Sequence, residues 1–446
     1  MGILRHLLPA LLAAACLLPA GLGAAAPEGK LDKRKAESLI KEFLEARPWS
    51  RFDAWDPAKR KELLEKAEAF PVPEGSFEIL RDLIAKHARK AAPKWKDAMP
   101  TPYGEATWIS KGKGGSKYGF VLGLHGGGEG AGSSSESAGN WPVAKHLCYY
   151  PQGVHLVSDT WNTVHGERFE LTLIDLAKAR EEVDPDRVYV MGFSMGGTGS
   201  FHMAARWPDL FAGAIPAHGV MMAEHVKEPN PDNVGRVQYG LVANLRNLVV
   251  YMYTGENDKN CEPGTFTRAW QMIEALRETD PEGYGGVTFT RHPNLAHAFP
   301  PGEPSKGIEV VTAARRNAFP DTIVWEYAEN PSPYLKADDK TTRLQQRGLY
   351  WLGCERPADL MQVRATKKHE GDALVVTLEV TGAFPEDFTI LLNPTMLGDA
   401  KKVIVKAGDA EHESMPPPSL AVMLDTYDYR CDTTLLFDRR VTISER

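Results

Sequence analysis

The feature that most constrains this 446-residue chain is a glycine-flanked serine between a strand and a helix. The apolar run 188–191 predicts a strand, the sequence Gly-Phe-Ser-Met-Gly of residues 192–196 follows it, and residues 197–205 predict a helix. A serine on so sharp a turn is strained, and glycines two residues to either side let the strand and helix backbones pass close to it. The pattern predicts Ser194 as a nucleophile, with a helix N-terminus that favours developing negative charge.

A second glycine turn lies upstream. The apolar strand predicted at 118–124 runs into His-Gly-Gly-Gly at 125–128. Backbone N–H groups of such a turn supply one half of an oxyanion hole, and the residue after the serine supplies the other half. We therefore predict an oxyanion hole formed by Gly126, Gly127 and Met195.

An acid follows the serine in the chain. Residues 248–253 form an apolar run that predicts a buried parallel strand, and Asp258 comes shortly after its carboxyl end, where the catalytic loops of such sheets lie. Asp258 is the predicted acid. Glu256 is the alternative, although it stands closer to the end of the strand.

A histidine follows the acid. Residues 287–290 predict a short strand, and His297 lies in the loop beyond it as the predicted base, with His292 as the alternative. His125 is expected to hold the glycine turn by hydrogen bonds. The remaining histidines show no metal-ligand spacing and are expected to be ordinary surface or core residues: His146, His155, His165, His202, His218 and His225.

The chemistry explains why these three residue types occur together. A serine hydroxyl is a weak nucleophile at neutral pH, so an imidazole must take its proton and later return it to the leaving group. A carboxylate fixes the tautomer of the imidazole and stabilises its protonated form. Ser194, His297 and Asp258 are therefore expected to form a catalytic triad.

Between residues 103 and 319 the chain resembles a group of secreted α/β-hydrolases. The group comprises prolyl oligopeptidases, dienelactone hydrolases and poly(3-hydroxybutyrate) depolymerase-like esterases. The motifs that carry the resemblance are HGGG at 125–128, GFSMGG at 192–197, GEND at 255–258 and HAFP at 297–300. Ala296 departs from the glycine often found before the histidine. The resemblance implies an α/β fold with a mostly parallel sheet and helices on both faces, and a serine hydrolase that needs no metal or organic cofactor.

The group contains both esterases and peptidases, so the resemblance does not define the substrate. A carboxylesterase acting on small or polymeric esters is the favoured function. A peptidase of the prolyl oligopeptidase type is the first alternative, but the chain has no room for the large N-terminal propeller of such peptidases. An inactive binding module is the second alternative, and the presence of a competent residue at every triad position argues against it.

Residues 1–26 have the pattern of a signal peptide. Arg5 precedes an apolar run at 7–18, and the small residues Ala24 and Ala26 suit cleavage close to Pro27. We expect a secreted or periplasmic protein with no membrane span in its mature form. Lipoprotein attachment at Cys16 is the alternative, but the apolar run continues past this cysteine.

Charge and cysteine content add two expectations. The formal net charge is −7 and no basic patch stands out, so nucleic acid is not an expected partner. Four cysteines remain outside the signal peptide, and they allow three disulfide pairings between which the sequence does not choose. These are Cys148, Cys261, Cys354 and Cys431. The oligomeric state has no signature in the sequence.

The chain after the signal peptide is predicted to have three parts. Residues 27–100 form a helical N-terminal extension, 101–335 the catalytic domain of alternating strands and helices, and 343–446 a small β-rich accessory domain. The accessory domain has no catalytic pattern, so its expected role is packing support or attachment to a polymer. Its strands are predicted at 373–380, 388–393, 402–406 and 433–437.

The substrate-binding surface is the least defined part of the sequence. Residues 126–140 are rich in glycine and serine and are expected to form a mobile loop beside the oxyanion hole. Residues 220–239 are long enough to form a cap over the acyl pocket. Trp141 and Trp161 are expected to pack in the core or its rim, with a substrate-facing wall as the alternative.

Overall fold

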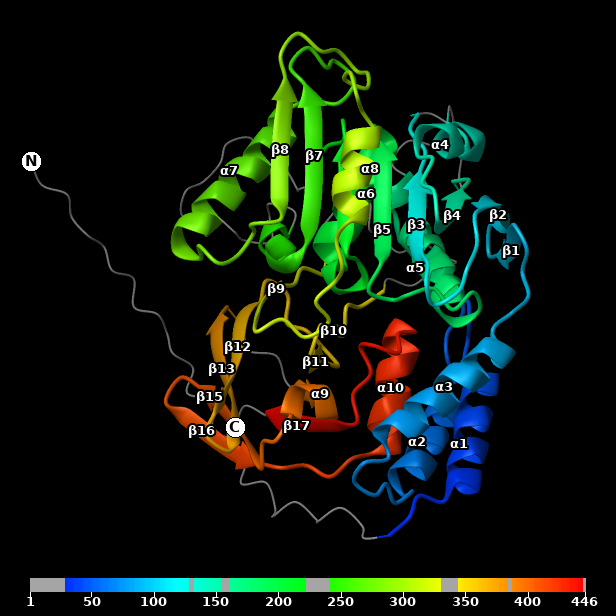
Figure 1. Ribbon diagram of the computed structural model, residues 1–446, viewed down its shortest axis with the longest axis vertical. Helices are drawn as coiled ribbons and strands as arrows, with labels where there is room; N and C mark the ends of the chain where they lie inside the picture. Colours follow the sequence, from blue (N-terminus) through cyan, green and yellow to red (C-terminus); the bar gives the residue numbers. More distant parts are fainter. Residues whose placement is uncertain are drawn as a thin grey trace, which may run out of the picture.

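A computed structural model describes residues 29–127, 132–153, 160–221, 241–329, 344–382 and 387–443. An α/β unit with a large sheet occupies the upper part of Figure 1, and two smaller sheets and a group of helices lie below it. Among the described residues, no helix is long and apolar enough to cross a bilayer. The predicted signal peptide lies outside these residues.

The upper unit is built on an eight-stranded sheet in the order β1-β2-β4-β3-β5-β6-β7-β8. The first three strands in this order pair antiparallel and all the others pair parallel. The mostly parallel sheet matches the expected fold class. The strands are β1 (Ala98–Thr101), β2 (Gly104–Lys111), β3 (Gly119–Leu124), β4 (His146–Pro151), β5 (Val188–Phe193), β6 (Gly213–Ala217), β7 (Val249–Gly255) and β8 (Val287–His292).

Helices cover both faces of this sheet. Every residue of β3 and β6 is buried, which explains why these strands are continuous apolar runs rather than alternating patterns. Apolar side chains of α5, α6 and α7 pack on one face, and those of α4 and α8 pack on the other. The helices and 3₁₀ turns of this unit are α4 (Ser134–Asn140), η1 (Thr160–Asn162), α5 (Val164–Ala179), α6 (Met195–Arg206), η2 (Pro208–Leu210), η5 (Val242–Asn247), α7 (Gly264–Thr279) and α8 (Ser305–Thr312).

The N-terminal extension consists of α1 (Lys33–Ala46), α2 (Pro57–Glu68) and α3 (Phe77–Ala91). The carboxylate of Asp56 accepts hydrogen bonds from the first backbone N–H groups of α2, and Pro57 occupies the first helical position. The three helices share one apolar core with α10 (Leu420–Arg430) from the far end of the chain. A helix near the C-terminal end of the described chain is thus packed against the N-terminal helices (Figure 1).

The C-terminal part contains two sheets, with strand orders β16-β15-β13-β12-β9 and β10-β11-β14-β17. Their elements are β9 (Thr322–Glu326), β10 (Gly348–Leu349), β11 (Leu352–Cys354), β12 (Gln362–Glu370), β13 (Ala373–Thr381), β14 (Phe388–Leu392), α9 (Pro394–Leu397), β15 (Lys402–Ala407), β16 (Ala410–Ser414) and β17 (Arg439–Ile443).

The strand predicted at 433–437 is wrong. These residues follow α10 as bends, and the backbone N–H groups of Thr434 and Leu435 donate to the carboxylate of Asp432 at 2.9 and 3.1 Å instead of to a neighbouring strand. A buried carboxylate therefore takes the hydrogen bonds that a sheet would have taken.

The two large parts of the chain are joined by a strand. β9 lies inside the range predicted for the catalytic domain, 101–335, yet it pairs antiparallel with β12 over five residue pairs. The predicted border between residues 335 and 343 therefore does not separate the eight-stranded sheet from the five-stranded sheet, because β9 lies before the border and belongs to the latter. The eight-stranded sheet ends with β8 instead.

Candidate active site

Ser194 occupies the turn between β5 and α6, as its sequence pattern predicts. Its φ is 59° and its ψ is −120°, a conformation that non-glycine residues rarely adopt. A Cβ on Gly192 would lie 2.1 Å from the carbonyl oxygen of Gly196, and a Cβ on Gly196 would lie 2.3 Å from that of Leu124. Both glycines are therefore required for the close approach of β5, α6 and β3.

The structure brings the three residues of the predicted triad together. His297 Nε2 lies 2.9 Å from Ser194 Oγ, and His297 Nδ1 lies 2.8 Å from Asp258 Oδ2. Neither alternative lies in this chain of hydrogen bonds: Glu256 is an exposed residue beside Arg291, and His292 packs its ring against Tyr253.

Asp258 is held from both of its oxygens. Its Oδ1 accepts backbone N–H bonds from Asn260 and Cys261 at 2.9 Å each. Burial alone would raise the pKa of Asp258, but the hydrogen bonds from Cys261, His297 and His218 outweigh it and keep this pKa below its ordinary value. The carboxylate therefore stays ionised and accepts hydrogen bonds at neutral pH.

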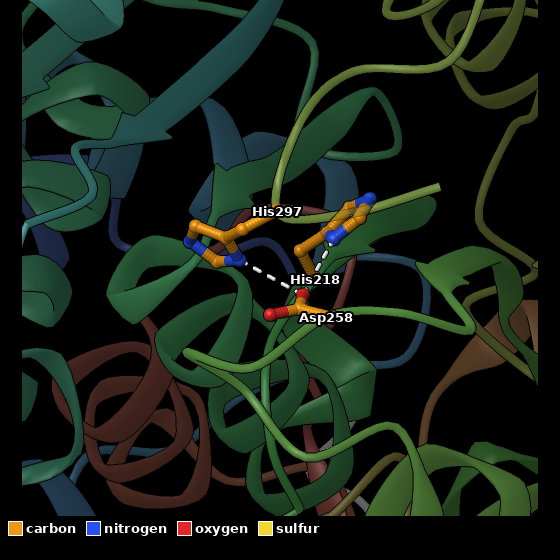
Figure 2. A group of neighbouring side chains, drawn as sticks. All are labelled: His218, Asp258 and His297. Atoms are coloured by element: carbon orange, nitrogen blue, oxygen red, sulfur yellow. Dashed lines mark hydrogen bonds and ion pairs between the residues drawn. The ribbon is translucent and has the colours of Figure 1, made fainter. Parts of the chain in front are cut away.

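His218 is a neighbour that the sequence analysis missed. Its Nδ1 lies 2.7 Å from Asp258 Oδ2, the same oxygen that contacts His297, and its side chain is completely buried. Figure 2 shows the two imidazole rings on either side of the carboxylate. The one signal in the sequence was the place of His218 directly after β6, where active-site loops of parallel sheets begin.

His218, Asp258 and His297 are also residue types that bind metal ions, and their ligand atoms lie close together. Ligand atoms around a tetrahedral Zn²⁺ with bonds of about 2.0 Å are about 3.3 Å apart. Here each Nδ1 lies only 2.7 or 2.8 Å from Oδ2, which is the spacing of a hydrogen bond to a carboxylate. As arranged, the three residues fit a hydrogen-bonded group better than a metal site.

The predicted oxyanion-hole residues lie beside Ser194. A Cβ on Gly126 would be 3.3 Å from the Cβ of Ser194, and Met195 is the first residue of α6, where backbone N–H groups have no partner within the helix. Gly127 follows with a φ of 88°, which favours glycine. His125 holds this turn: its Nδ1 donates to the Gly126 carbonyl at 2.8 Å and its Nε2 accepts from a backbone N–H.

Comparison with known proteins relates most of the upper unit to a hydrolase family. Residues 149–326 match the model of the Dienelactone hydrolase family. This segment, which is less than half of the chain, is similar to that family of α/β-hydrolases. A stretch of 47 residues is 49% identical to poly(3-hydroxyalkanoate) depolymerase C of Paucimonas lemoignei, and it spans 10% of this chain and 11% of the depolymerase.

Solved structures similar to this α/β-hydrolase include esterases. An acetyl xylan esterase from Aspergillus awamori is 16% identical, with a TM-score of 0.36, over 49% of this chain and 98% of the esterase. A carboxylesterase from Bacillus cereus is 18% identical, with a TM-score of 0.30, over 46% of this chain and 92% of that enzyme. Since both TM-scores mark only distant likeness, the strand order and the family match carry the fold assignment.

Aromatic rings surround the histidines of this α/β-hydrolase. The ring of Phe193 lies 4.9 Å from that of His297, 5.0 Å from that of His218 and 4.5 Å from that of Phe299. Cys261, which the sequence analysis did not connect with the site, places its Sγ 4.0 Å from Ser194 Oγ. Burial raises the pKa of this thiol to about 11, so it stays protonated at neutral pH.

The structure tests part of the predicted substrate surface. Trp141 and Trp161 are fully buried, so they pack in the core and do not form a substrate-facing wall. The indole N–H of Trp161 donates to the carbonyl of His125 at 2.9 Å, which further fixes the glycine turn. Residues 134–140 form α4 rather than a loop, while the predicted cap at 220–239 lies almost wholly outside the described residues.

The four cysteines considered for disulfides all have free thiols. Cys148, Cys354 and Cys431 are buried at separate places in the fold, and Cys261 lies near Ser194. Among the described residues the fold is therefore held by packing, hydrogen bonds and ion pairs rather than by disulfides.

Proposed function

We propose that this chain is a serine carboxylesterase in which Ser194, His297 and Asp258 form the catalytic triad. The observation that carries the proposal is the hydrogen-bonded series from Ser194 Oγ to His297 Nε2 at 2.9 Å and from His297 Nδ1 to Asp258 Oδ2 at 2.8 Å. Both distances are within the range for direct proton transfer and for orientation of the imidazole.

The reaction begins when Ser194 Oγ attacks the carbonyl carbon of the ester while His297 Nε2 takes the hydroxyl proton. The negative charge that forms on the carbonyl oxygen is stabilised by the backbone N–H groups of Gly126 or Gly127 and of Met195. The C–O bond of the ester then breaks, and His297 returns the proton to the departing alcohol. Water attacks the acyl-serine by the same route, which releases the acid and restores Ser194.

An ester is the favoured substrate class because the family match and the 47-residue similarity both lie among hydrolases, and the latter is with a polyester depolymerase. We further propose that residues 1–26 direct export, so that the enzyme meets small or polymeric esters outside the cytoplasm. The proposed chemistry needs no metal ion or organic cofactor, because the triad provides its own nucleophile, base and anion stabilisation.

The test begins with covalent labelling. A fluorophosphonate is expected to label the protein once, on Ser194. Ser194→Ala should lose the label, and its rate of hydrolysis of chromogenic acyl esters should fall by on the order of 10⁴-fold or more. A panel of dipeptidyl amides assayed in parallel separates esterase from peptidase activity. Labelling that persists in Ser194→Ala would disprove the role of Ser194.

A matched pair of histidine variants tests the base. His297→Ala should lower ester turnover by orders of magnitude, because His297 Nε2 is the imidazole nitrogen within hydrogen-bond reach of Ser194 Oγ. His292→Ala should change turnover little, since that ring packs on Tyr253 and not on the serine. The opposite result would assign the base to His292.

A further inference from the structure

We propose that His218 is a positioning residue that holds the acid of the triad, an inference that rests on the proposed function. His218 Nδ1 lies 2.7 Å from Asp258 Oδ2, slightly closer than His297 Nδ1 at 2.8 Å. The carboxylate oxygen that orients the catalytic histidine thus also contacts a second imidazole (Figure 2).

The proton positions on His218 follow from its surroundings. An ionised carboxylate only accepts hydrogen bonds, so Nδ1 of His218 carries the proton and donates a hydrogen bond to Oδ2. Its Nε2 is buried and meets no hydrogen-bond partner in the described part of the chain. Protonation at Nε2 would bury an unpaired N–H and a positive charge, which is unfavourable. His218 therefore donates as a neutral imidazole and adds no charge to the site.

The backbone fixes the direction of this ring. His218 directly follows β6 and has a φ of 49°, in the left-handed region. Its backbone N–H donates to the carbonyl of Tyr253 in β7 at 2.9 Å. A Cβ on the next residue, Gly219, would lie 2.4 Å from the carbonyl carbon of Gly197 in α6. The turn is thus confined between β7 and the helix that carries the nucleophile, and such confinement sustains strained conformations.

His218 has two consequences for the triad. It holds Oδ2 in place from a second direction beside His297, while the backbone N–H groups of Asn260 and Cys261 hold Oδ1. It also takes part of the negative charge on Oδ2, which lowers the attraction between this oxygen and a protonated His297. The ionisable groups that face His218 are Asp258, His297 and His292, together with the buried phenol of Tyr253.

Two variants separate the hydrogen bond from the packing. His218→Asn keeps an amide N–H close to the position of Nδ1, and asparagine tolerates a left-handed backbone better than other non-glycine residues. His218→Leu keeps a similar volume without a donor. A hydrogen bond to a charged group is worth about 1.5–3 kcal/mol, so kcat of His218→Leu should fall by about 10-fold to 100-fold. Because the ring is completely buried, KM should remain within about 2-fold.

His218→Asn should keep kcat within about 3-fold of the unsubstituted enzyme. The pH profile gives a readout that looser packing alone would not produce. Without the donor, Oδ2 attracts protonated His297 more strongly, so the acidic limb of kcat/KM should move to higher pH in His218→Leu and stay in place in His218→Asn. Unchanged kcat in His218→Leu, or an equal loss in both variants with an unmoved acidic limb, would overturn the proposal.

A spectroscopic measurement keeps the inference testable if His218→Leu fails to fold. Two imidazole N–H groups donate to Oδ2, so His218→Asn should lose one low-field imidazole proton resonance by NMR and keep that of His297. The pairs of His87 with Glu37 and of His202 with Glu167 give the same resonances in both proteins and serve as internal references. An unchanged set of low-field resonances in His218→Asn would refute the second donor. Ser194→Ala distinguishes failure of the proposed function from failure of the positioning role. If Ser194→Ala stays active, the proposed function is wrong. If it is inactive and His218→Leu is fully active, only the positioning role is wrong.

Discussion

Replacement of Asp432 by asparagine tests the joint between the α/β unit and the C-terminal part. The Asp432 side chain is fully buried, and its Oδ2 accepts from Lys178 Nζ at 2.8 Å and from Arg316 Nη1 at 2.9 Å. Both cationic side chains are only 1% exposed. Lys178 comes from α5, Arg316 follows α8, and Asp432 follows α10, so one carboxylate contacts two buried cations from the other unit.

The expected loss in the free energy of unfolding depends on which contacts survive in Asp432→Asn. The side-chain amide in Asp432→Asn would keep the volume and the Oδ1 acceptor, and Arg316 would keep Asp186 at 2.7 Å. Lys178 would retain its charge in a buried site with a neutral amide in place of its carboxylate. Breaking a buried ion pair by removing one partner costs about 3–5 kcal/mol, and the retained contacts place Asp432→Asn near the lower end, about 3 kcal/mol. That corresponds to roughly a 100-fold change in the folding equilibrium.

Denaturant unfolding at pH 7 measures this difference, with Glu413→Gln as the matched control. Glu413 pairs with Lys402 at 2.8 Å, but both side chains are well exposed, so its loss should cost less than about 1 kcal/mol. Adding Lys178→Met to Asp432→Asn should recover part of the stability, because it removes the unpaired charge. An Asp432→Asn variant as stable as the control would refute the reasoning.

The sign of the pH dependence is also defined. The cations near Asp432 hold its pKa well below the ordinary value despite burial. Its contribution to stability is therefore complete above the unfolded pKa of about 3.9 and disappears as the pH falls through the lower folded value. The deficit of Asp432→Asn should be full at pH 7 and shrink in strong acid.

Three further predictions concern other parts of the molecule. Ester hydrolysis should be unaffected by EDTA, because the proposed triad supplies the nucleophile without a metal; a loss of activity that a divalent ion restores would contradict this. Burial raises the pKa of Asp438 to about 7, so its ionisation destabilises the fold increasingly as the pH rises from about 4 to about 7. Asp438→Asn should therefore be more stable than the unsubstituted protein at pH 8, and equal unfolding midpoints at that pH would refute the effect. Truncation after residue 340 should give an unfolded or aggregated product, although the sequence predicts a separate catalytic domain at 101–335, since β9 loses β12 and Lys178 loses Asp432; a monodisperse, cooperatively unfolding fragment that hydrolyses a small ester would refute this.

The sheet and the nucleophile turn were predictable because their physics is local in sequence. Parallel strands covered on both faces must be continuous apolar runs, and a serine turn between a strand and a helix must have glycines at fixed positions. The predicted acid, Asp258, follows such a strand, β7, and the predicted base, His297, follows the short edge strand β8, so their approach to Ser194 was predicted from chain order.

The remaining neighbours of the site were not predictable because their proximity depends on strand order. His218 and Asp258 are 40 residues apart and meet only because β6 and β7 are adjacent and parallel. Cys261 approaches Ser194 because its backbone N–H donates to Asp258 Oδ1. A histidine or cysteine beyond a strand looks the same in the sequence whether or not the neighbouring strand brings a carboxylate to it.

The C-terminal part contributes to stability at the amino ends of the parallel strands, and the candidate site lies at their carboxyl ends. The arrowheads of β7 and β8 point away from the two smaller sheets in Figure 1, and Asp258 and His297 follow these carboxyl ends. Asp432 instead meets α5 and the segment after α8. A charge buried at that joint should therefore change the fraction of folded enzyme but not the rate at which folded enzyme works. Asp432→Asn assayed well below its unfolding midpoint should keep kcat and KM, and a folded variant with a changed kcat would show that the joint is coupled to the site.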